Sequence, residues 1–479
     1  MTEGTGGLLY RVAVATAIVF ALAHFIALPI SISVDGGQYI DMAEMLGSDR
    51  FPTEWHEGRT PLFPLLLKCS FGLFGRQPMA AGAVGIGLGL AGTLAAGEAI
   101  RRLAGPWPAS ASLLLLSAYP TLVAFEHFVL TESGTFCFLA LTVWVLTWDA
   151  STGARRWRQA VALVLVLAGG YYLRQTLVSL SPLVAVLFGW NAWRHRPQRA
   201  SAAAPKRRAA TAALVQMLLV GAAPHLLALP WQRCVEESPF RDIVLCQGMI
   251  RQALLPPDHP YLGIDGPFYA DAIERSRFEG HLYSGLRQDL LYQALVRIRP
   301  RIPMPFGKTF LELAWQYPFR YLSGVGRTLM LFAGAGGLES ESENIRQCVL
   351  NPALLVDRNI ICIEPTALRT HIHEDFSHPV KPSATMRFLW SATGTYGWLL
   401  RVSMICGGAG LLLGLVRRDL PLLILYGPPA AFLLLHAAFL ASIDRFAVPG
   451  QPLFIAALAA MPVLAVRALK PSVQNIASV

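Results

Sequence analysis

Ionisable side chains gather at a few places next to long apolar runs of this sequence. Asp35 follows the first run, in Ser-Val-Asp-Gly-Gly-Gln-Tyr, and Arg59 precedes a shorter run, in Trp-His-Glu-Gly-Arg-Thr-Pro. Ionisable residues beside or inside apolar membrane segments are costly and therefore mark functional sites by default. A carboxylate there suits general-base catalysis, and an arginine suits bidentate binding of a phosphate. On pattern alone, Asp35 is equally suited to capping a helix, and Arg59 to contacting ordinary lipid headgroups.

Further charges stand at the ends of later apolar runs. Glu132 begins one run, Arg174 lies between two runs with no room for an extended loop, and Asp444 with Arg445 lies between the last two runs. An acid in the first turn of a helix favours the helix dipole, which is the simpler explanation for Glu132. A charge held as tightly as Arg174 is expected to pair, either with a carboxylate such as Glu132 or with an anionic ligand.

Two histidine-containing stretches have the residue types of a metal site. His56 stands beside Glu57, and residues 371–378 read His-Ile-His-Glu-Asp-Phe-Ser-His. Histidine and carboxylate ligands suit zinc or manganese. His56 and Glu57 supply only two adjacent ligands, which is weak evidence, and no helical or strand spacing supports 371–378, for which a solvated loop is the main alternative. The sequence has no Walker loop, HExxH, GxSxG or Rossmann fingerprint in a strand–helix context. A divalent cation is left open, and no other cofactor is expected.

The elements that carry these residues must cross a membrane. The chain has 479 residues, of which 54% are hydrophobic and only 15% are charged, whereas soluble chains carry about 25% charged residues. Apolar runs of about 20 residues recur along the sequence, and that length matches the roughly 30 Å hydrocarbon thickness of a bilayer. These features exclude a soluble globular enzyme, a disordered chain and a secreted disulfide scaffold. The sequence therefore predicts an all-α polytopic membrane protein.

Ten membrane spans are predicted, with both chain ends in the cytoplasm. Their approximate ranges are 8–30, 79–100, 107–127, 129–148, 158–173, 176–193, 211–230, 389–416, 420–441 and 449–467. The first run is long for a signal peptide and no cleavage site stands out after it, so we expect it to remain as a helix. The net charge of +10 comes from basic clusters at the ends of the runs. The positive-inside rule explains these clusters as cytoplasmic loops, and nucleic-acid binding is not expected.

Two segments between the spans are expected to face the outside and to define the domains. The first outer loop, residues 31–78, belongs to an N-terminal transmembrane catalytic core over 1–230, and its short apolar stretch 61–74 is predicted to lie along the interface. A small periplasmic domain with an interfacial helix is predicted over 231–388. The C-terminal transmembrane helices then cover 389–479.

Four of the seven cysteines lie in the large outer segment. An even number there suits an oxidising compartment and two disulfides. The local pairings Cys234–Cys246 and Cys348–Cys362 are favoured, and free buried thiols are the alternative.

The order of these features resembles the GT-C membrane glycosyltransferases that use polyprenyl-phosphate-linked sugars. Within that class, the chain looks most like the family of aminoarabinose transferases of lipid A, protein O-mannosyltransferases and lipopolysaccharide galacturonosyltransferases. The matching elements are Asp35-x-x-x-Tyr39, Glu57-Gly-Arg59-Thr-Pro-Leu-Phe-Pro, Thr131-Glu132, Arg174 and Arg445-Phe-x-x-Pro-x-x-Pro. Each motif is short, so the resemblance, which covers the whole chain, depends on their order and on the topology. It implies a GT-C-like helical bundle of about 10 transmembrane helices.

The resemblance also implies a role for each matching residue. Asp35 would be the catalytic carboxylate that removes a proton from the acceptor hydroxyl, and Glu132 a second acidic group. Several relatives carry glutamate directly after that aspartate, whereas Gly36 stands here, which leaves a metal or second-acid role open at that position.

The remaining matching residues would bind substrate. The implied phosphate-binding cations are Arg59, Arg174 and Arg445. The implied cavity-lining residues are Tyr39, Glu57 and Asp444.

The implied donor is a polyprenyl-phosphate-linked sugar. The acceptor would be an envelope glycolipid, polysaccharide or protein, and transfer would take place among the lipids of the bacterial inner membrane on its periplasmic side, with inversion by one direct displacement. Three alternatives are a lipid-linked glycan transporter or flippase, an O-antigen ligase or polymerase, and a non-enzymatic scaffold. A transporter predicts inverted repeats and midplane charges, whereas here the charges lie at the outer face. The sugar and the acceptor stay open.

Overall fold

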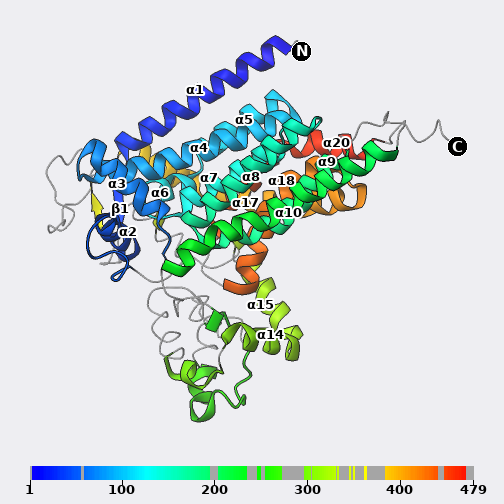
Figure 1. The fold of residues 1–479 in the computed structure, drawn as a ribbon. Helices are drawn as coiled ribbons and strands as arrows, with labels where there is room; N and C mark the ends of the chain where they lie inside the picture. Colours follow the sequence, from blue (N-terminus) through cyan, green and yellow to red (C-terminus); the bar gives the residue numbers. More distant parts are fainter. Residues whose placement is uncertain are drawn as a thin grey trace.

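The computed structural model describes residues 3–55, 59–194, 203–234, 254–271, 296–303, 305–330, 383–440 and 447–470, with short pieces at 245–246, 248–249, 332–333, 345–346, 349–350 and 361–363. Most of these residues form one bundle of long apolar helices, and a smaller group of helices lies beside it (Figure 1). The prediction of a helical polytopic membrane protein is confirmed.

The N-terminal part of the bundle is centred on one helix, α4, which packs against α1, α5 and α7. The helices of this part are α1 (Glu3–Ala27), α4 (Pro78–Ala104), α5 (Pro106–Ser117), α6 (Pro120–Glu126), α7 (Glu132–Leu146), α8 (Gly153–Leu173), the 3-10 turn η1 (Gln175–Leu180), α9 (Ser181–Arg194) and α10 (Ala203–Cys234). Small residues on α4 let its neighbours approach closely. A methyl group at Gly92 would lie only 2.8 Å from the Phe136 ring of α7. α10 is longer than predicted, because the alanine-rich stretch before 211 favours helix.

The C-terminal helices return to this core. They are α17 (Ala384–Arg417), α18 (Leu420–Leu435), the π-helical turn η6 (His436–Leu440), α19 (Gln451–Leu458) and α20 (Met461–Leu469). The Ser112 hydroxyl of α5 donates to the Ala456 carbonyl at 2.6 Å, and the Tyr119 hydroxyl donates to Gln451 Oε1 at 3.2 Å. These bonds satisfy buried polar groups across the two parts, so the last helices are integral to the core.

All ten predicted spans fall on helices of the described residues. Six helices are long and apolar enough to cross a membrane, or eight if each of two bent pairs counts as one span. The bent pairs are α5 with α6 and α19 with α20, at 60° and 67°. In each pair the second helix has proline in its first turn, where a missing N–H prevents a continuous helix. The other two predicted spans are α7, with only 15 residues, and α8, which begins with arginines.

The first outer loop is tied to distant parts of the chain. Strand β1 (Ile30–Ile32) pairs antiparallel with β2 (Ile361–Ile363), with Ser31 opposite Cys362. This small sheet was not predicted, because three-residue strands leave no period in the sequence. The loop continues as α2 (Val34–Met45) and α3 (Leu62–Phe74), and α3 packs against α2 and α4. At 13 residues, α3 is the short apolar helix predicted over 61–74.

The described part of the large outer segment has a core of its own. The helices of this segment include η2 (Gly263–Asp265), η3 (Arg299–Arg301), α14 (Phe306–Gln316) and α15 (Pro318–Met330). Buried side chains from this segment, including Tyr269 and Phe310, pack together. The stretch 310–332, whose aromatic residues and two arginines predict the interfacial helix of this segment, is broken at Pro318, because proline suits the start of a helix better than its interior.

The predicted Cys234–Cys246 disulfide is wrong, because both residues are free thiols. Cys246 is buried in the core of the outer segment, whereas Cys234 is exposed at the end of α10. The two thiols therefore lie in different environments. The other predicted pairing, Cys348–Cys362, falls outside the described side chains.

Candidate functional site

The start of α2 positions Asp35. Ser33 is the N-cap of this helix, and its hydroxyl accepts the Gly36 amide at 3.2 Å. Asp35 is therefore not the capping residue, and its carboxylate lies in the first turn, where an acidic group is favoured by the helix dipole. A Cβ atom at Gly36 would lie 2.9 Å from the Val129 carbonyl oxygen. Only a residue without a side chain therefore lets the start of α2 approach residue 129 this closely.

Arg59 joins three side chains of α2. Its Nη2 donates to Asp35 Oδ1 at 2.6 Å and to Gln38 Oε1 at 3.0 Å. Its Nη1 donates to the Tyr39 hydroxyl at 3.1 Å, and its guanidinium carbon lies 5.0 Å from the centre of the Tyr39 ring. The Trp55 indole N–H donates to the Arg59 carbonyl at 2.9 Å and so fixes the backbone from which the side chain extends.

This cluster of Asp35, Gln38, Tyr39 and Arg59 is partly withdrawn from solvent. The side chains of Arg59 and Asp35 are 19% and 26% exposed, and Tyr39 is buried. Charges in such a place interact more strongly than in water, because screening is weaker. The cluster therefore offers a carboxylate that can accept a proton and, directly beside it, a planar cation that can hold an anion.

A second pair of charges joins α7 to the end of α8. Arg174, the C-cap residue of α8, places Nη1 3.4 Å from Oε1 of Glu132, the first residue of α7. Their side chains are 15% and 2% exposed. The helix ends meet because Gly134 leaves room for Leu173, whose Cδ2 would lie 2.7 Å from a methyl group at that glycine. Of the two partners expected for Arg174, a carboxylate or an anionic ligand, the structure shows the carboxylate of Glu132.

The two clusters lie on connected backbone. The Ser31 amide donates to the His127 carbonyl at 2.8 Å, and the Val129 amide donates to the Ser31 carbonyl at 3.0 Å. Asp35 follows Ser31 by four residues, and Glu132 follows Val129 by three residues. Figure 1 shows β1, α2 and α6 gathered at the same end of the bundle.

Three residues of the site were not predicted. Gln38 and Trp55 hold Arg59 as described above, and Gln38 stands three residues after Asp35, which is a helical spacing that could have indicated a shared face. His436 is buried close enough to Arg174 for their charges to interact, and its Nδ1 donates to the Phe432 carbonyl at 2.8 Å. Its sequence position, inside an apolar run, indicated only a core histidine.

Two further acids of α2 lie outside the cluster. Asp41 and Glu44 form ion pairs with Arg50 and Arg76 at the surface. Glu57, Asp444 and Arg445, with the histidine stretch 371–378, fall outside the described residues. Within the part of the chain that is described, no three His, Cys, Asp or Glu side chains are grouped so that they could hold a metal ion.

Comparison with known proteins gives a family match for part of the chain. Residues 58–226 match the family model described as dolichyl-phosphate-mannose-protein mannosyltransferase. Among solved structures, the chain is similar to ArnT from Cupriavidus metallidurans bound to undecaprenyl phosphate (14% identity, 95% of this chain and 77% of that chain, TM-score 0.36) and in the apo state (16% identity, 97% and 78%, TM-score 0.35). No curated protein sequence gives a significant match.

The apolar helices define a multi-pass membrane protein, and the part of the chain over 58–226 is similar to the protein mannosyltransferases. The match begins at Gly58, ends within α10, and contains Arg59, Glu132 and Arg174. The resemblance deduced from the sequence is confirmed over this stretch.

Proposed function

We propose that the protein transfers a single sugar from a polyprenyl-phosphate-linked donor to a lipid, polysaccharide or protein acceptor. The observation that supports this most is the ion pair between Asp35 and Arg59, half-withdrawn from water at one end of the bundle. Arg59 belongs to the stretch that matches a family named for a polyprenyl-phosphate-sugar donor. The reaction takes place on the periplasmic face of the bacterial inner membrane, the side to which the positive-inside rule assigns Asp35.

In this proposal Asp35 is the general base. It accepts the proton of the acceptor hydroxyl while the hydroxyl oxygen attacks the anomeric carbon of the sugar. The bond from that carbon to the donor phosphate breaks, and the polyprenyl phosphate leaves with the electron pair. One direct displacement of this kind inverts the anomeric configuration, and a positioned base contributes roughly 10²–10⁴-fold to its rate.

Arg59 and Arg174 stabilise the departing phosphate, with Arg445 as a third predicted cation. Negative charge grows on the phosphate as the anomeric bond breaks, and cations held in place beforehand stabilise that transition state. Glu132 holds Arg174, and Tyr39 and Gln38 hold Arg59. Glu57 and Asp444 are assigned to the substrate cavity on the resemblance alone.

The ion pair links donor binding to base activation. A phosphate that binds Arg59 competes with Asp35 for the same guanidinium, whose Nη2 now donates to the carboxylate. Donor binding then releases Asp35 from its partner at the moment when a base is needed. The free site keeps the two charges paired, which avoids an uncompensated charge at a half-buried position.

The experiment is transfer from a panel of synthetic polyprenyl-phosphate sugars by purified protein in detergent with mixed lipid extract. Release of polyprenyl phosphate from one donor by the wild type, and its loss in Asp35→Asn, would support the proposal and name the sugar. Asp41→Asn is the matched control, because Asp41 lies on the same helix in an exposed pair with Arg50. Near wild-type turnover by Asp35→Asn would remove Asp35 from the mechanism. No turnover of any donor by folded wild type would favour diphosphate-linked donors or transport.

A further inference from the structure

A buried arginine lies at the opposite end of the bundle from the candidate site. Arg156, in the first turn of α8, is only 9% exposed. Among the described residues, its Nε and Nη1 atoms have no hydrogen-bond acceptor. Buried donors of a charged group are nearly always paired, because leaving them without an acceptor is costly. Arg156 therefore calls for an anionic partner.

Two indole N–H groups near the same helix ends are also buried without a hydrogen-bond acceptor. The Nε1 atoms of Trp144, in the last turn of α7, and of Trp148, two residues after that helix ends, are buried and have no acceptor among the described residues. Their ring centres lie 5.3 Å apart in an edge-to-face arrangement. An indole nitrogen can only donate, so these atoms, like those of Arg156, require an acceptor.

The packing of α8 on α7 brings these donors to one level. Gln159 Nε2 donates to the Val145 carbonyl at 2.8 Å and to the Leu146 carbonyl at 3.2 Å. Arg156 stands three residues before Gln159, on the same face and one turn closer to the start of α8. It is thus placed beside the last residues of α7, the level of Trp148.

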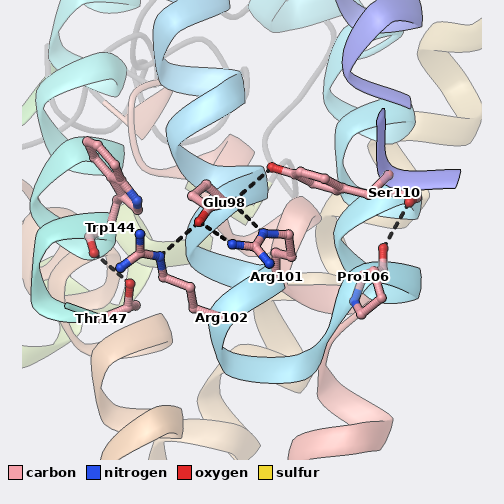
Figure 2. Close-up of polar contacts among 8 residues, drawn as sticks. Glu98, Arg101, Arg102, Pro106, Ser110, Trp144 and Thr147 are labelled. Atoms are coloured by element: carbon pink, nitrogen blue, oxygen red, sulfur yellow. Dashed lines mark hydrogen bonds and ion pairs between the residues drawn. The ribbon is translucent and has the colours of Figure 1, made fainter. Parts of the chain in front are cut away.

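A further cation lies beside Trp144. The Arg102 guanidinium carbon is 6.0 Å from the centre of the Trp144 ring. Figure 2 shows how Glu98 holds it: the carboxylate accepts from Arg102 Nε at 2.9 Å, from Arg101 Nε at 2.6 Å and from Arg101 Nη2 at 2.7 Å. One carboxylate thus orders two arginines, and one positive charge remains uncompensated.

The acidic residue nearest to Arg156 in the sequence is already paired. Asp149, at the turn between α7 and α8, pairs with Arg155 and accepts the Ser151 amide at 2.8 Å. The helix ends therefore keep an excess of positive charge. Trp157, next to Arg156, is exposed, and exposed tryptophans at helix ends mark the level of lipid headgroups.

We propose that the ends of α7 and α8 bind the phosphate of an anionic glycerophospholipid of the cytoplasmic leaflet. Phosphate oxygens accept from the Arg156 guanidinium and from the Trp148 indole, while Arg102 adds a second cation at the Trp144 side. The guanidinium fork matches a phosphate in geometry as well as in charge. The site is independent of the proposed sugar transfer, because it lies at the other membrane surface.

The test is a titration of the delipidated full-length protein in detergent with phosphatidylglycerol or phosphatidylcholine, followed by native mass spectrometry. The wild type should retain phosphatidylglycerol in preference to phosphatidylcholine. Arg156→Gln should weaken phosphatidylglycerol binding at least about fivefold, as expected from roughly 1 kcal/mol per cation at a headgroup. Arg158→Gln is the matched control, because it removes the same charge two residues away from an exposed side chain.

Two further arms keep the test decisive. Trp148→Phe keeps the aromatic ring but removes the indole donor, and it should weaken phosphatidylglycerol binding even if Arg156→Gln fails to fold. Inorganic phosphate at the same concentration distinguishes the sources: displacement of the lipid by phosphate alone would make the ligand a free anion instead of a lipid. Equal phosphatidylglycerol binding by wild type, Arg156→Gln and Trp148→Phe would overturn the proposal.

Discussion

At the scale of residues, Arg59 is the centre of the candidate site. One guanidinium contacts a carboxylate, an amide and a phenol, and all three partners come from two turns of α2. Because all three partners are acceptors on one helix, the orientation of Arg59 depends on the fork of its guanidinium and not on charge alone. Its replacement by another cation is therefore informative.

Arg59→Lys should weaken donor binding although the charge is kept. A lysine ammonium cannot reproduce the parallel N–H pair, and a hydrogen bond to a charged group contributes about 1.5–3 kcal/mol. The KM for the donor should therefore rise at least about tenfold, since 1.4 kcal/mol corresponds to that factor, and the KM for the acceptor should change less. Steady-state kinetics with varied donor measures this. Tyr39→Phe, which removes one contact and keeps the ring, should give a smaller rise. Equal donor KM in Arg59→Lys and wild type would exclude Arg59 from the phosphate site.

Glu132→Gln tests the second pair. The amide keeps the shape of the side chain but leaves Arg174 without its buried anion, which is destabilising by several kcal/mol when nothing else compensates the charge. A bound donor phosphate would compensate it, so the thermal unfolding midpoint of Glu132→Gln should fall in the free protein and recover when polyprenyl phosphate is added. A midpoint that recovers no more than that of wild type would place Arg174 away from the donor.

At the scale of elements, α4 is shaped by where its glycines lie. A methyl group at Gly85 would overlap the carbonyl oxygen of Glu126 on α6, whereas the same group at Gly87 would meet nothing. The first glycine thus lets α6 approach α4 and carry residues 127–129 to β1. The second faces away from neighbouring helices.

Gly85→Ala should therefore destabilise the protein and Gly87→Ala should not. Overpacking against backbone costs about 1–3 kcal/mol, while an exposed substitution stays within about 0.5 kcal/mol. The thermal unfolding midpoint in detergent checks both variants, which differ only in the face of the same helix. Equal midpoints would mean that α6 does not pack against α4 at this glycine.

The end of α10 and the outer segment give a chemical test of the free thiols. Cys234 is exposed and should react with a maleimide without prior reduction. Cys246 should stay unlabelled until the protein unfolds, because burial raises the pKa of its thiol to about 12 and leaves almost no thiolate at neutral pH. Mass spectrometry of the unreduced protein measures the labelling of both thiols, in a Cys69→Ser background because Cys69 is also exposed. If Cys234 were labelled only after reduction, the Cys234–Cys246 disulfide would be supported and the free thiols contradicted.

At the scale of the whole molecule, the positions of helices were predictable and their contacts were not. Apolar runs long enough for a bilayer located all ten helical regions, because that length is a constraint of the solvent. Asp35 and Arg59 were found by residue type beside such runs. Their mutual ion pair was not predicted, since 24 residues separate them and the path of the loop between them is set by tertiary contacts such as that of Trp55. The electrostatic influence of Arg174 on His436 depends on helix packing and has no local signal.

The topology itself is testable with single cysteines in a background that lacks exposed native ones. Thr53→Cys lies on the first outer loop and Arg158→Cys at the start of α8, and both side chains are exposed. The positive-inside rule predicts that an impermeant maleimide labels the first from outside intact cells and the second only in inverted vesicles. Labelling of both from one side would contradict the assignment of Asp35 to the periplasmic face.

The pairing of β1 with β2 sets the order in which the protein can mature. Ser31 leaves the ribosome early, but its strand partner Cys362 is synthesised 331 residues later. At about 5–20 residues per second, the first loop waits roughly 17–66 s for this strand. Throughout that interval the segment before Asp35 has an unpaired edge outside the membrane. A nascent chain truncated before residue 361 would therefore insert its first helices and still lack the β1–β2 pairing next to Asp35. Maturation of the site is thus delayed until most of the protein has been translated.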